Sequence, residues 1–448
     1  MNMSEEIKTQ DYDVVVIGGG IGGMDTALNL GDMGFKVALV EKQPSIGGKM
    51  ILLSKVFPTL DCASCISTPK VAAVSHHPNI KLLTYTEVKD ISKESDNKFK
   101  VKVTKKARYV HEDLCTGCKQ CESKCPVVVP DQFNFGLVGR KAVYIPFSTA
   151  VPKVSLIDLD NCVLCGACER VCPTNPKSID FSQKPEDIEL NAKSVVLATG
   201  FDLFPAEKIE NLTYGKSKNV INSMEMERLL APTRPFNTVL RPSDGKVPDK
   251  IAYVLCTGSR DRTVGNPICS QVCCMYSIKQ AQLLLGALPL VDITIFYIDI
   301  RAFGKGYEEF YQQAKDMDVH FIKGKVAKIT EKENGNLIVK YEDIENGGRL
   351  SEGEFDMVVL SVGLLSASSS IMSSMRNLNV TLDNQKYILS PDETLYPART
   401  NIPGIYVAGT ASGPKDIPDS VASAGSAASE VAAYIAMNYG KIKKVKGE

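Results

Sequence analysis

The sequence predicts an α/β fold that contains two dinucleotide-binding domains and a small α+β domain inserted into the first of them. Three observations support this prediction. A strand, a glycine-rich turn and a helix follow one another at the start of the chain; two regular series of cysteines interrupt the α/β pattern; and a second strand–turn unit lacks the glycines. A chain of 448 residues is long enough for two or three domains with a substantial core.

The first strand–turn–helix unit has the order expected of a dinucleotide-binding domain. Residues 13–17 form a short β-branched run, typical of a strand buried on both faces. The glycines follow at once, and residues 24–33 are predicted to be helical. The glycines allow a tight turn, close approach of the backbone to a pyrophosphate, and tight packing of helix on strand. We expect the cofactor phosphates to lie at the helix start, beside Gly18, Gly20, Gly22 and Gly23.

A second predicted strand, residues 36–40, ends at Glu41. This carboxylate lies about 20 residues past the glycines, where such domains place the acid that binds a ribose. The following loop, residues 42–49, can curl around a nucleotide, so we expect cofactor contacts from Lys42, Gly47, Gly48 and Lys49. Strand, glycines, helix, second strand and acid occur in order. This favours a nucleotide site over a glycine-rich turn in another kind of α/β domain.

Two later segments favour FAD over NAD as the nucleotide. Residues 192–200 form a buried strand that ends at a glycine turn, and residues 402–409 precede a helix rich in Ala and Ser. In flavoproteins with two dinucleotide-binding domains, the second unit approaches the ribityl chain and the pyrophosphate. Thr410 stands where many such enzymes have an acid, so that contact must be made differently. The residues expected to contact FAD here are Thr199, Gly200, Gly409 and Thr410.

Between these segments the sequence changes character. Residues 81–91 and 98–103 alternate as antiparallel strands do. From about residue 109 to 179 the pattern Cys-x-x-Cys-x-x-Cys-x-x-x-Cys-Pro then occurs twice. It is the pattern of bacterial two-cluster ferredoxins, in which the fourth cysteine binds the other cluster. We therefore assign one [4Fe–4S] cluster to Cys115, Cys118, Cys121 and Cys172, and the other to Cys162, Cys165, Cys168 and Cys125. Zinc is the alternative, but zinc sites pair their ligands and have no use for four closely spaced thiolates.

A second α/β unit starts at residues 250–255 and continues with strands at 292–297 and 319–322. In a pyridine-nucleotide disulfide oxidoreductase this unit would carry a second Gly-x-Gly-x-x-Gly for NAD(P)H. Here the strand runs into cysteines instead. A third, irregular [4Fe–4S] cluster fits Cys256, Cys269, Cys273 and Cys274. Adjacent cysteines are unusual ligands, so a vicinal disulfide and unreactive buried thiols remain as alternatives.

Cys62 and Cys65 form a separate Cys-x-x-Cys pair. Two cysteines cannot fill a four-coordinate site by themselves. The pair is therefore a redox dithiol, a set of ligands completed from elsewhere, or two inert thiols near the flavin. His76 and His77 lie just beyond the pair and are predicted to be turn or surface residues rather than ligands.

The bulk composition limits the classes of function. With 52 basic and 52 acidic residues the net charge is zero, which does not indicate a nucleic-acid partner. The N-terminal residues lack the features of a signal peptide, and no apolar run is long enough to cross a bilayer. Fourteen cysteines without an export signal indicate metal or redox chemistry in a reducing cytoplasm. The basic tail, residues 441–446, is predicted to be a solvated charge run.

Together these motifs resemble the family of heterodisulfide reductase A subunits, which includes the A subunit of quinone-interacting oxidoreductase complexes. The resemblance covers nearly the whole chain. It rests on the flavin fingerprint, the stretch 58–65, the double ferredoxin pattern and the four irregular cysteines. It implies a thioredoxin reductase-like flavoprotein with an inserted α+β two-cluster ferredoxin domain and a third cluster at the irregular cysteines. It also implies that Lys279 matches a family lysine near flavin N5 and acts in catalysis, with a surface lysine as the alternative.

The resemblance also implies a function and an order of segments. We expect an oxidoreductase subunit that passes electrons between FAD and the clusters and on to partner subunits acting on heterodisulfide, quinone or sulfur compounds. We expect a homodimer within a larger assembly. The segments are the first part of the FAD domain (1–106), the ferredoxin insert (107–185), the second part with a linker (186–245), the second α/β domain (246–363), and the closing part with the tail (364–448).

Two departures and two alternatives qualify this expectation. Larger family members carry an extra N-terminal domain and a C-terminal ferredoxin module, whereas this chain begins at the flavin strand and has no cysteine after Cys274. We therefore expect fewer electron routes and do not assume bifurcation. One alternative is a self-contained NAD(P)H-dependent reductase like the small subunit of glutamate synthase, which the missing second glycine fingerprint disfavours. The other is a scaffold that holds clusters without flavin turnover.

Overall fold

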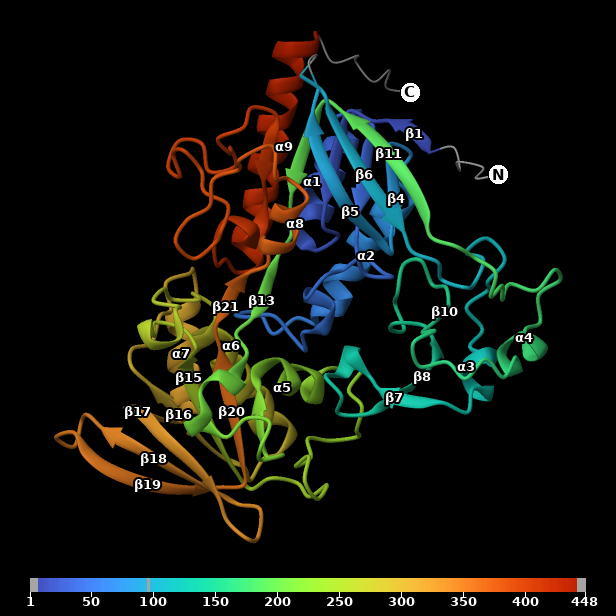
Figure 1. Ribbon diagram of the computed structural model, residues 1–448. Coiled ribbons are helices and arrows are strands. Elements are labelled where there is room, and N and C mark those ends of the chain that lie inside the picture. The colour runs from blue at the N-terminus through green and yellow to red at the C-terminus, as the bar shows by residue number, and fades with distance from the viewer. Residues whose placement is uncertain (1–6, 95–96, 441–448) are drawn as a thin grey trace.

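The computed structural model describes residues 7–94 and 97–440. Figure 1 shows three parts: the first α/β domain at the top, the second α/β domain at the lower left, and the cysteine-rich insert at the right. The N-terminal residues and the basic tail, 441–446, lie outside the described residues. Within the described ranges, no helix combines the length and the apolar character needed to span a membrane.

The first domain is built on a five-stranded sheet of parallel neighbours in the order β22-β12-β2-β3-β4. Both faces of this sheet are covered, so every residue of β2 is buried. Val14 and Val16 pack on the side of the helices, and Val15 and Ile17 pack on the opposite side. The elements are β2 (Val14–Ile17), β3 (Val37–Val40), β4 (Ile80–Leu83), β12 (Ser194–Leu197), β22 (Ile405–Val407), α1 (Ile21–Asp32), α2 (Ala63–His76) and α9 (Ile417–Tyr439).

A four-stranded sheet covers the other face, in the order β1-β11-β6-β5. Its strands are β1 (Lys8–Asp11), β5 (Thr86–Lys93), β6 (Phe99–Lys105) and β11 (Glu186–Ala192), and α8 (Ser369–Ser373) packs beside them. Lys105 at the end of β6 pairs with Glu186 at the start of β11. The chain therefore leaves this sheet for the insert and returns to the neighbouring position, which leaves the sheet undisturbed.

The prediction of one antiparallel strand over residues 81–91 is wrong. The segment contains two strands in different sheets, because β4 pairs in parallel with β3 and β5 pairs antiparallel with β6. The chain turns between them at Tyr85, which has a φ of 54°. Neither Gly nor Pro marks this turn, so the alternating pattern runs through it without interruption. The second expected strand, 98–103, corresponds to β6.

The insert is small and built from short elements. They are α3 (Gln120–Lys124), α4 (Ala167–Val171), β7 (Val128–Pro130), β8 (Gly139–Lys141), β9 (Val143–Tyr144) and β10 (Leu156–Ile157). α3 and α4 are equivalent: each follows a residue in the left-handed conformation and each ends at the fourth cysteine of a series. Six of the eight cysteines of the insert pack with Val110, Val143, Ile157 and Ile179 in its apolar core.

The second α/β domain contains a seven-stranded sheet in the order β14-β20-β15-β16-β17-β18-β19. Its strands are β14 (Val220–Asn222), β15 (Lys250–Thr257), β16 (Asp292–Tyr297), β17 (His320–Glu331), β18 (Leu337–Asp343), β19 (Arg349–Phe355) and β20 (Met357–Val362). α5 (Ser223–Leu230), α6 (Cys273–Ala287) and α7 (Tyr307–Asp316) pack on it. The antiparallel pair β13 (Phe201–Leu203) and β21 (Leu364–Ser366) connects the two domains (Figure 1).

Short 3₁₀ turns complete the described chain. They are η1 (Met50–Leu52), η2 (Gln132–Asn134), η3 (Ala206–Lys208), η4 (Glu210–Leu212), η5 (Arg262–Val264) and η6 (Gly409–Ser412). Two of them adjoin glycine turns of the first domain. η1 follows the loop that contains Gly47 and Gly48, and η6 begins at Gly409, ahead of α9.

Candidate flavin and cluster site

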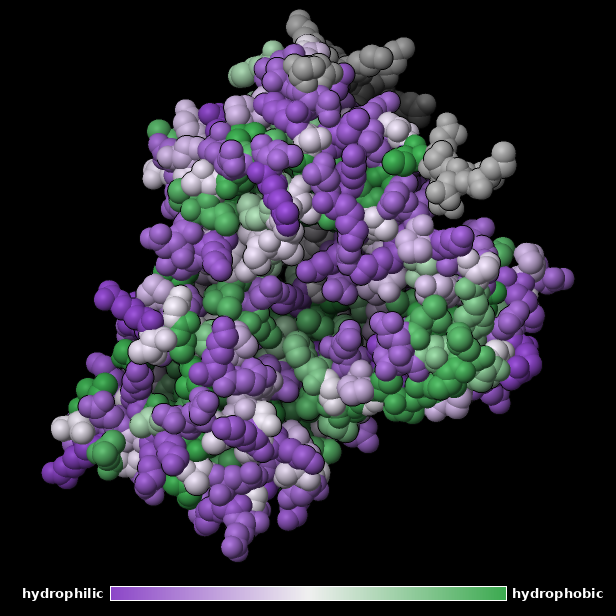
Figure 2. All heavy atoms as spheres, viewed as in Figure 1, coloured by the Kyte–Doolittle hydropathy of each residue, from purple (hydrophilic) through white to green (hydrophobic). Residues whose placement is uncertain are grey.

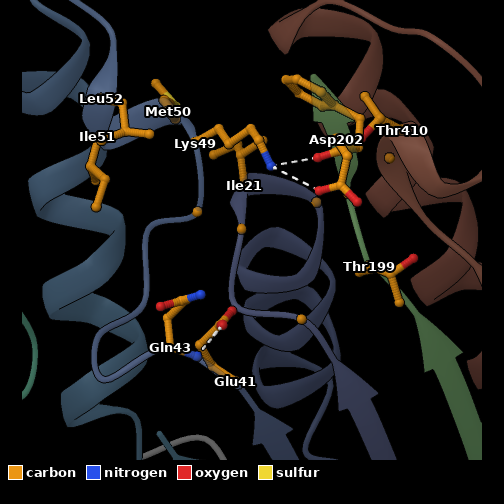
Figure 3. A pocket seen from close by; sticks show the side chains of 18 of the residues that line it. Ile21, Glu41, Gln43, Lys49, Met50, Ile51, Leu52, Thr199, Asp202 and Thr410 are labelled. Carbon is orange, nitrogen blue, oxygen red and sulfur yellow. Dashed lines mark hydrogen bonds and ion pairs between the residues drawn. The ribbon is translucent and has the colours of Figure 1, made fainter. Parts of the chain in front are cut away.

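One cavity of about 1320 Å³ lies where the three parts of the molecule meet. Its first wall is the glycine-rich turn after β2, with the loop that follows β3. The insert supplies a second wall through Phe133 and Phe147, and the second domain supplies a third through Glu227 and Lys279. Figure 2 shows the surface hollowed between the three parts, with apolar residues (green) gathered there, and Figure 3 shows part of the first wall. Parallel α/β sheets place ligands outside the carboxyl ends of their strands, as here.

At the start of α1 and in the loop that faces it, the backbone rather than side chains lines the cavity. A Cβ atom on Gly20 would meet only the Cα of Gly48, 3.9 Å away, so Gly20 opens into the cavity. A Cβ on Gly48 would lie 2.7 Å from the Cα of Gly20, so this loop can approach only as glycine. Gly23 allows the helix to pack closely on the preceding turn, since a Cβ at this position would lie 1.8 Å from the carbonyl oxygen of Gly18. This backbone cradle fits a pyrophosphate.

Glu41 lies at the end of β3 with 7% of its surface exposed. One carboxylate oxygen accepts a hydrogen bond from the Gly19 amide at 2.7 Å, and the other accepts one from the Gln43 amide at 2.7 Å (Figure 3). Burial nevertheless raises the pKa of Glu41. A carboxylate has about four lone-pair sites, so Glu41 retains acceptor capacity for the hydroxyl groups of a ribose.

The wall near β12 offers a buried hydroxyl and a partly buried ammonium group. Thr199 Oγ1 is buried and, within the described part of the chain, has no hydrogen-bond partner. Lys49 donates to the Phe201 carbonyl at 2.5 Å and lies 3.7 Å from Asp202, and Figure 3 shows it pointing toward Asp202. Burial lowers the pKa of Lys49. An unpaired hydroxyl and a partly desolvated ammonium suit a polar, anionic ligand, so these residues fit FAD.

Lys279 is buried, with 1% of its surface exposed, so the alternative of a surface lysine is wrong. Its ammonium forms an ion pair with Glu227 and donates to the Lys55 carbonyl at 3.0 Å. Burial lowers the pKa of Lys279, while the Glu227 charge raises it. Gln280 also donates to Glu227, at 2.5 Å. Lys279, Gln280 and Glu227 all line the cavity.

The four irregular cysteines gather at the start of α6, beside the end of β15. All four are free thiols, so the vicinal disulfide is not formed in this structure. Cys273 and Cys274 are buried, whereas Cys256 and Cys269 are partly exposed. Burial raises the pKa of Cys273, and the other three thiols raise it further. Burial likewise raises the pKa of Cys274 to about 12. A thiol becomes a metal ligand once the metal displaces its proton.

Three of the four cysteines in each series of the insert have matching exposure, whereas Cys172 is buried and Cys125 is partly exposed. Cys121 and Cys168 are buried in its core, and Cys118 and Cys165 are exposed at its surface. Burial raises the pKa of Cys121, with further increases from Cys115 and Cys118, the cysteines assigned to the same cluster. Burial raises the pKa of Cys168 to about 11. The donor set is entirely thiol, which suits iron–sulfur clusters.

Among the described residues, no three His, Cys, Asp or Glu side chains converge closely enough to hold a single metal ion. A cube of four irons sets its ligands farther apart than a single ion does, because each thiolate binds a different iron.

Comparisons with known proteins find two family models that match this chain. Residues 12–136 and 157–428 match the family model for pyridine nucleotide-disulphide oxidoreductases, and residues 114–176 match the 4Fe-4S dicluster domain. The iron–sulfur A subunit of the CoB–CoM heterodisulfide reductase of Methanocaldococcus jannaschii is 45% identical over 99% of this chain and 67% of its own length. The chain belongs to the family of heterodisulfide reductase A subunits.

Other family members match the chain with similar identity and over a similar part of its length. The A subunit of the H(2):CoB-CoM heterodisulfide,ferredoxin reductase of Methanothermobacter thermautotrophicus is 44% identical over 98% of this chain and 65% of its own length. The A subunit of the ferredoxin:CoB-CoM heterodisulfide reductase of Methanosarcina mazei is 44% identical over 94% of this chain and 52% of its own length. The chain thus spans about half to two thirds of the length of these curated relatives.

Solved structures confirm the predicted thioredoxin reductase-like fold of this family member. The thioredoxin reductase of T. acidophilum superposes with a TM-score of 0.52 at 16% identity, covering 94% of this chain and 97% of its own. The Lactococcus lactis thioredoxin reductase gives a TM-score of 0.52 at 16% identity, covering 95% and 99% of the two chains. At this identity the likeness concerns the fold alone.

The structure brings most of the predicted cofactor residues of this family member to the cavity. Those that line it are Gly18, Gly20, Gly22, Glu41, Lys42, Gly48, Lys49, Thr199, Gly200, Gly409 and Thr410, together with Lys279. Gly23 and Gly47 do not line it. Glu227, Gln280 and the contribution of the insert were not predicted from the sequence. Glu227 lies on α5, which also contains Glu225 and Arg228, so the sequence alone did not mark it as a buried residue.

Proposed function

We propose that this chain is the flavin and iron–sulfur subunit of a heterodisulfide reductase-like complex. It passes electrons between FAD and [4Fe–4S] clusters and on to partner subunits. One observation carries the proposal. A single cavity is lined by the glycine turn of the first domain, by the cysteine-rich insert, and by α6, the helix on which Cys273 and Cys274 lie. A flavin in this cavity would therefore contact the insert and α6, both of which carry cysteines assigned to clusters.

We assign the cofactors to the residues already described. The glycine cradle, Glu41, Lys49 and Thr199 hold FAD. The eight cysteines of the insert hold two [4Fe–4S] clusters, and the four cysteines beside α6 hold a third. FAD, when bound, accepts two electrons together and releases them singly, whereas each cluster carries one at a time.

The buried pair Lys279–Glu227 is proposed to balance charge and protons at the cavity wall. The Lys279 ammonium and the Glu227 carboxylate form an ion pair. Burial lowers the pKa of Lys279 and so favours its neutral form. A negative charge that develops in the cavity would therefore favour the charged form of Lys279 over its neutral form. The Lys55 carbonyl and Gln280 hold the two side chains in place while this happens. Lys279 then acts as a positive charge or as a proton donor beside the cofactor.

The partners are proposed from the relatives. Their names place them in reductases for a heterodisulfide, two of them with ferredoxin. We propose a complex that acts on a heterodisulfide, a quinone or a sulfur compound in the cytoplasm, with this chain as a homodimer inside it. The self-contained NAD(P)H reductase is not favoured, since the second domain offers cysteines in place of the phosphate-binding glycines.

Anaerobic purification of the full chain tests the proposal. We expect one FAD together with about eight irons for two clusters and about twelve for three. Gly20→Val places a side chain in the phosphate cradle and should weaken FAD binding about 100-fold, or about 2.7 kcal/mol, without loss of iron. Gly425→Ala is the matched control, because its Cβ meets nothing within 4 Å. Zinc in place of iron, or no FAD, would contradict the proposal. Rapid reduction of the flavin by NADH or NADPH would favour the self-contained reductase.

A further inference from the structure

Cys62 and Cys65 are joined in a disulfide, with their Cα atoms 5.2 Å apart. Among the described residues this is the one disulfide, while the twelve cysteines assigned to clusters are free thiols. Neither Cys62 nor Cys65 lines the cavity. The pair is therefore distinct from the flavin and cluster sites, and the proposed function does not use it.

The two sulfurs have different surroundings. Cys62 is the N-cap of α2, a helix of 14 residues, and its sulfur accepts a hydrogen bond from the Cys65 amide at 3.3 Å. The Ser64 hydroxyl lies 3.2 Å from the same sulfur. Cys65 is exposed and is followed by Ile66, which keeps 38% of its surface exposed. The Cys65 amide and the helix dipole stabilise a thiolate at Cys62, while a reactant can reach Cys65.

We propose that Cys62 and Cys65 form a thiol–disulfide exchange site that takes an electron pair from an external dithiol, either a small molecule or a protein. A donor thiolate attacks the Cys65 sulfur, the Cys62–Cys65 bond breaks, and Cys62 leaves as the stabilised thiolate. The second donor thiolate then attacks the donor sulfur bound to Cys65 and releases the Cys65 thiolate. The donor is oxidised to a disulfide, its two thiol protons pass to Cys62 and Cys65, and two electrons reduce the pair.

The position of the pair connects this site to the cavity. Cys62 forms an antiparallel bridge with Lys55, whose carbonyl accepts the hydrogen bond from Lys279. Phe57, in the same segment, lines the cavity and packs edge-on against Tyr307 with ring centroids 5.4 Å apart. The exchange site therefore lies at one end of a short segment whose other end contacts the buried lysine.

Thiol mapping on the anaerobically purified full chain with its cofactors tests the proposal. The protein is alkylated with N-ethylmaleimide before and after treatment with dithiothreitol, and peptides are identified by mass spectrometry. We expect Cys62 and Cys65 to resist alkylation before reduction and to react after it, with both thiols lost again on addition of oxidised dithiothreitol. The proposal would be overturned if Cys62 and Cys65 were alkylated under all these conditions, or under none of them.

Single variants test the assigned order of attack. With glutathione disulfide as the probe, Cys62→Ser should form a stable mixed disulfide at Cys65, whereas Cys65→Ser should form one at Cys62 at least about tenfold more slowly. Ser64→Ala should slow exchange, while Ser75→Ala, on the same helix but away from the sulfurs, should not. Iron analysis tests the competing role, in which Cys62 and Cys65 are cluster ligands. Loss of about four irons in the Cys62→Ser chain would make the pair cluster ligands and end the proposal.

Discussion

The two α/β domains use the same strand–turn–helix unit for different chemistry. In the first domain, β2 leads through glycines into α1, and the turn offers backbone amides. In the second domain, β15 leads through cysteines into α6, and the turn offers thiols. Both turns lie at the carboxyl end of a central parallel strand. The position in the fold therefore selects where a cofactor binds, and the residues of the turn select which cofactor it is.

The difference has a physical origin. A phosphate binds to hydrogen-bond donors and needs space that is free of side chains. Glycines therefore allow backbone amides to bind it directly. A cluster needs four side chains at fixed distances, so the second turn is longer and buries two of its cysteines. Buried thiols are costly to ionise without a metal, as the raised pKa values of Cys273 and Cys274 indicate. We therefore expect the second turn to depend on its cofactor for stability more than the first does.

The largest effect is expected from Cys273→Ser. Removing a ligand should release the third cluster, about four irons per chain, together with the folding free energy that its binding supplies. Iron analysis and thermal unfolding measure the two losses. Ser277→Ala, on the same helix and one turn away, should retain the iron although it removes the hydrogen bond to Ser361. Full iron content in the Cys273→Ser chain would contradict the cluster and leave the buried, unreactive thiols as the better interpretation.

A smaller effect is expected from the charged pair of the second domain. Lys279→Met leaves the Glu227 carboxylate buried and unpaired, which should lower the free energy of unfolding by about 3–5 kcal/mol. Urea unfolding of the holoprotein measures it. The double variant Lys279→Met with Glu227→Gln removes both charges and should recover most of the loss. If the single and the double variant were equally destabilised, the pair would not be coupled as its geometry indicates.

The first turn could be predicted from sequence almost residue by residue, whereas the cysteines of the second turn lack a regular spacing and left alternatives open. A glycine cradle requires glycine at particular positions, because a Cβ on Gly48 would lie 2.7 Å from the Cα of Gly20 and one on Gly23 would lie 1.8 Å from the carbonyl oxygen of Gly18. That requirement leaves a fixed pattern in the chain. The regular cysteine spacing of the insert is fixed for a similar reason, since three ligands of one cluster come from a single loop.

The rest of the site depends on contacts between residues far apart in the sequence. Lys279 meets Glu227 only because α5 and α6 pack side by side, and the insert reaches the cavity through Phe133 and Phe147 only by tertiary packing. The strand boundary at Tyr85 was missed because no turn residue marks it. Nothing local marked Glu227 as a member of a buried pair, because α5 also contains Glu225 and Arg228.

The smallest effect is expected from the carboxylate of the first turn. Burial raises the pKa of Glu41, and ribose hydroxyls that donate to it would favour its ionised form. FAD affinity should therefore fall as the pH falls through this raised pKa, at a higher pH than an ordinary glutamate would give. Glu41→Gln cannot ionise, so its FAD affinity should be lower by about tenfold near pH 7, or about 1.4 kcal/mol, and independent of pH across the same range.

Fluorescence titration of the apoprotein with FAD at several pH values measures both quantities. Gln43→Ala is a matched control, since Gln43 lines the same cavity and contacts Glu41 through its backbone amide, which the substitution retains. Its affinity should keep the pH dependence of the unaltered chain. An equal pH dependence in the Glu41→Gln chain would assign the titration to another group. The first turn would then bind FAD through its backbone alone, which would make the contrast with the cysteine-bearing turn of the second domain complete.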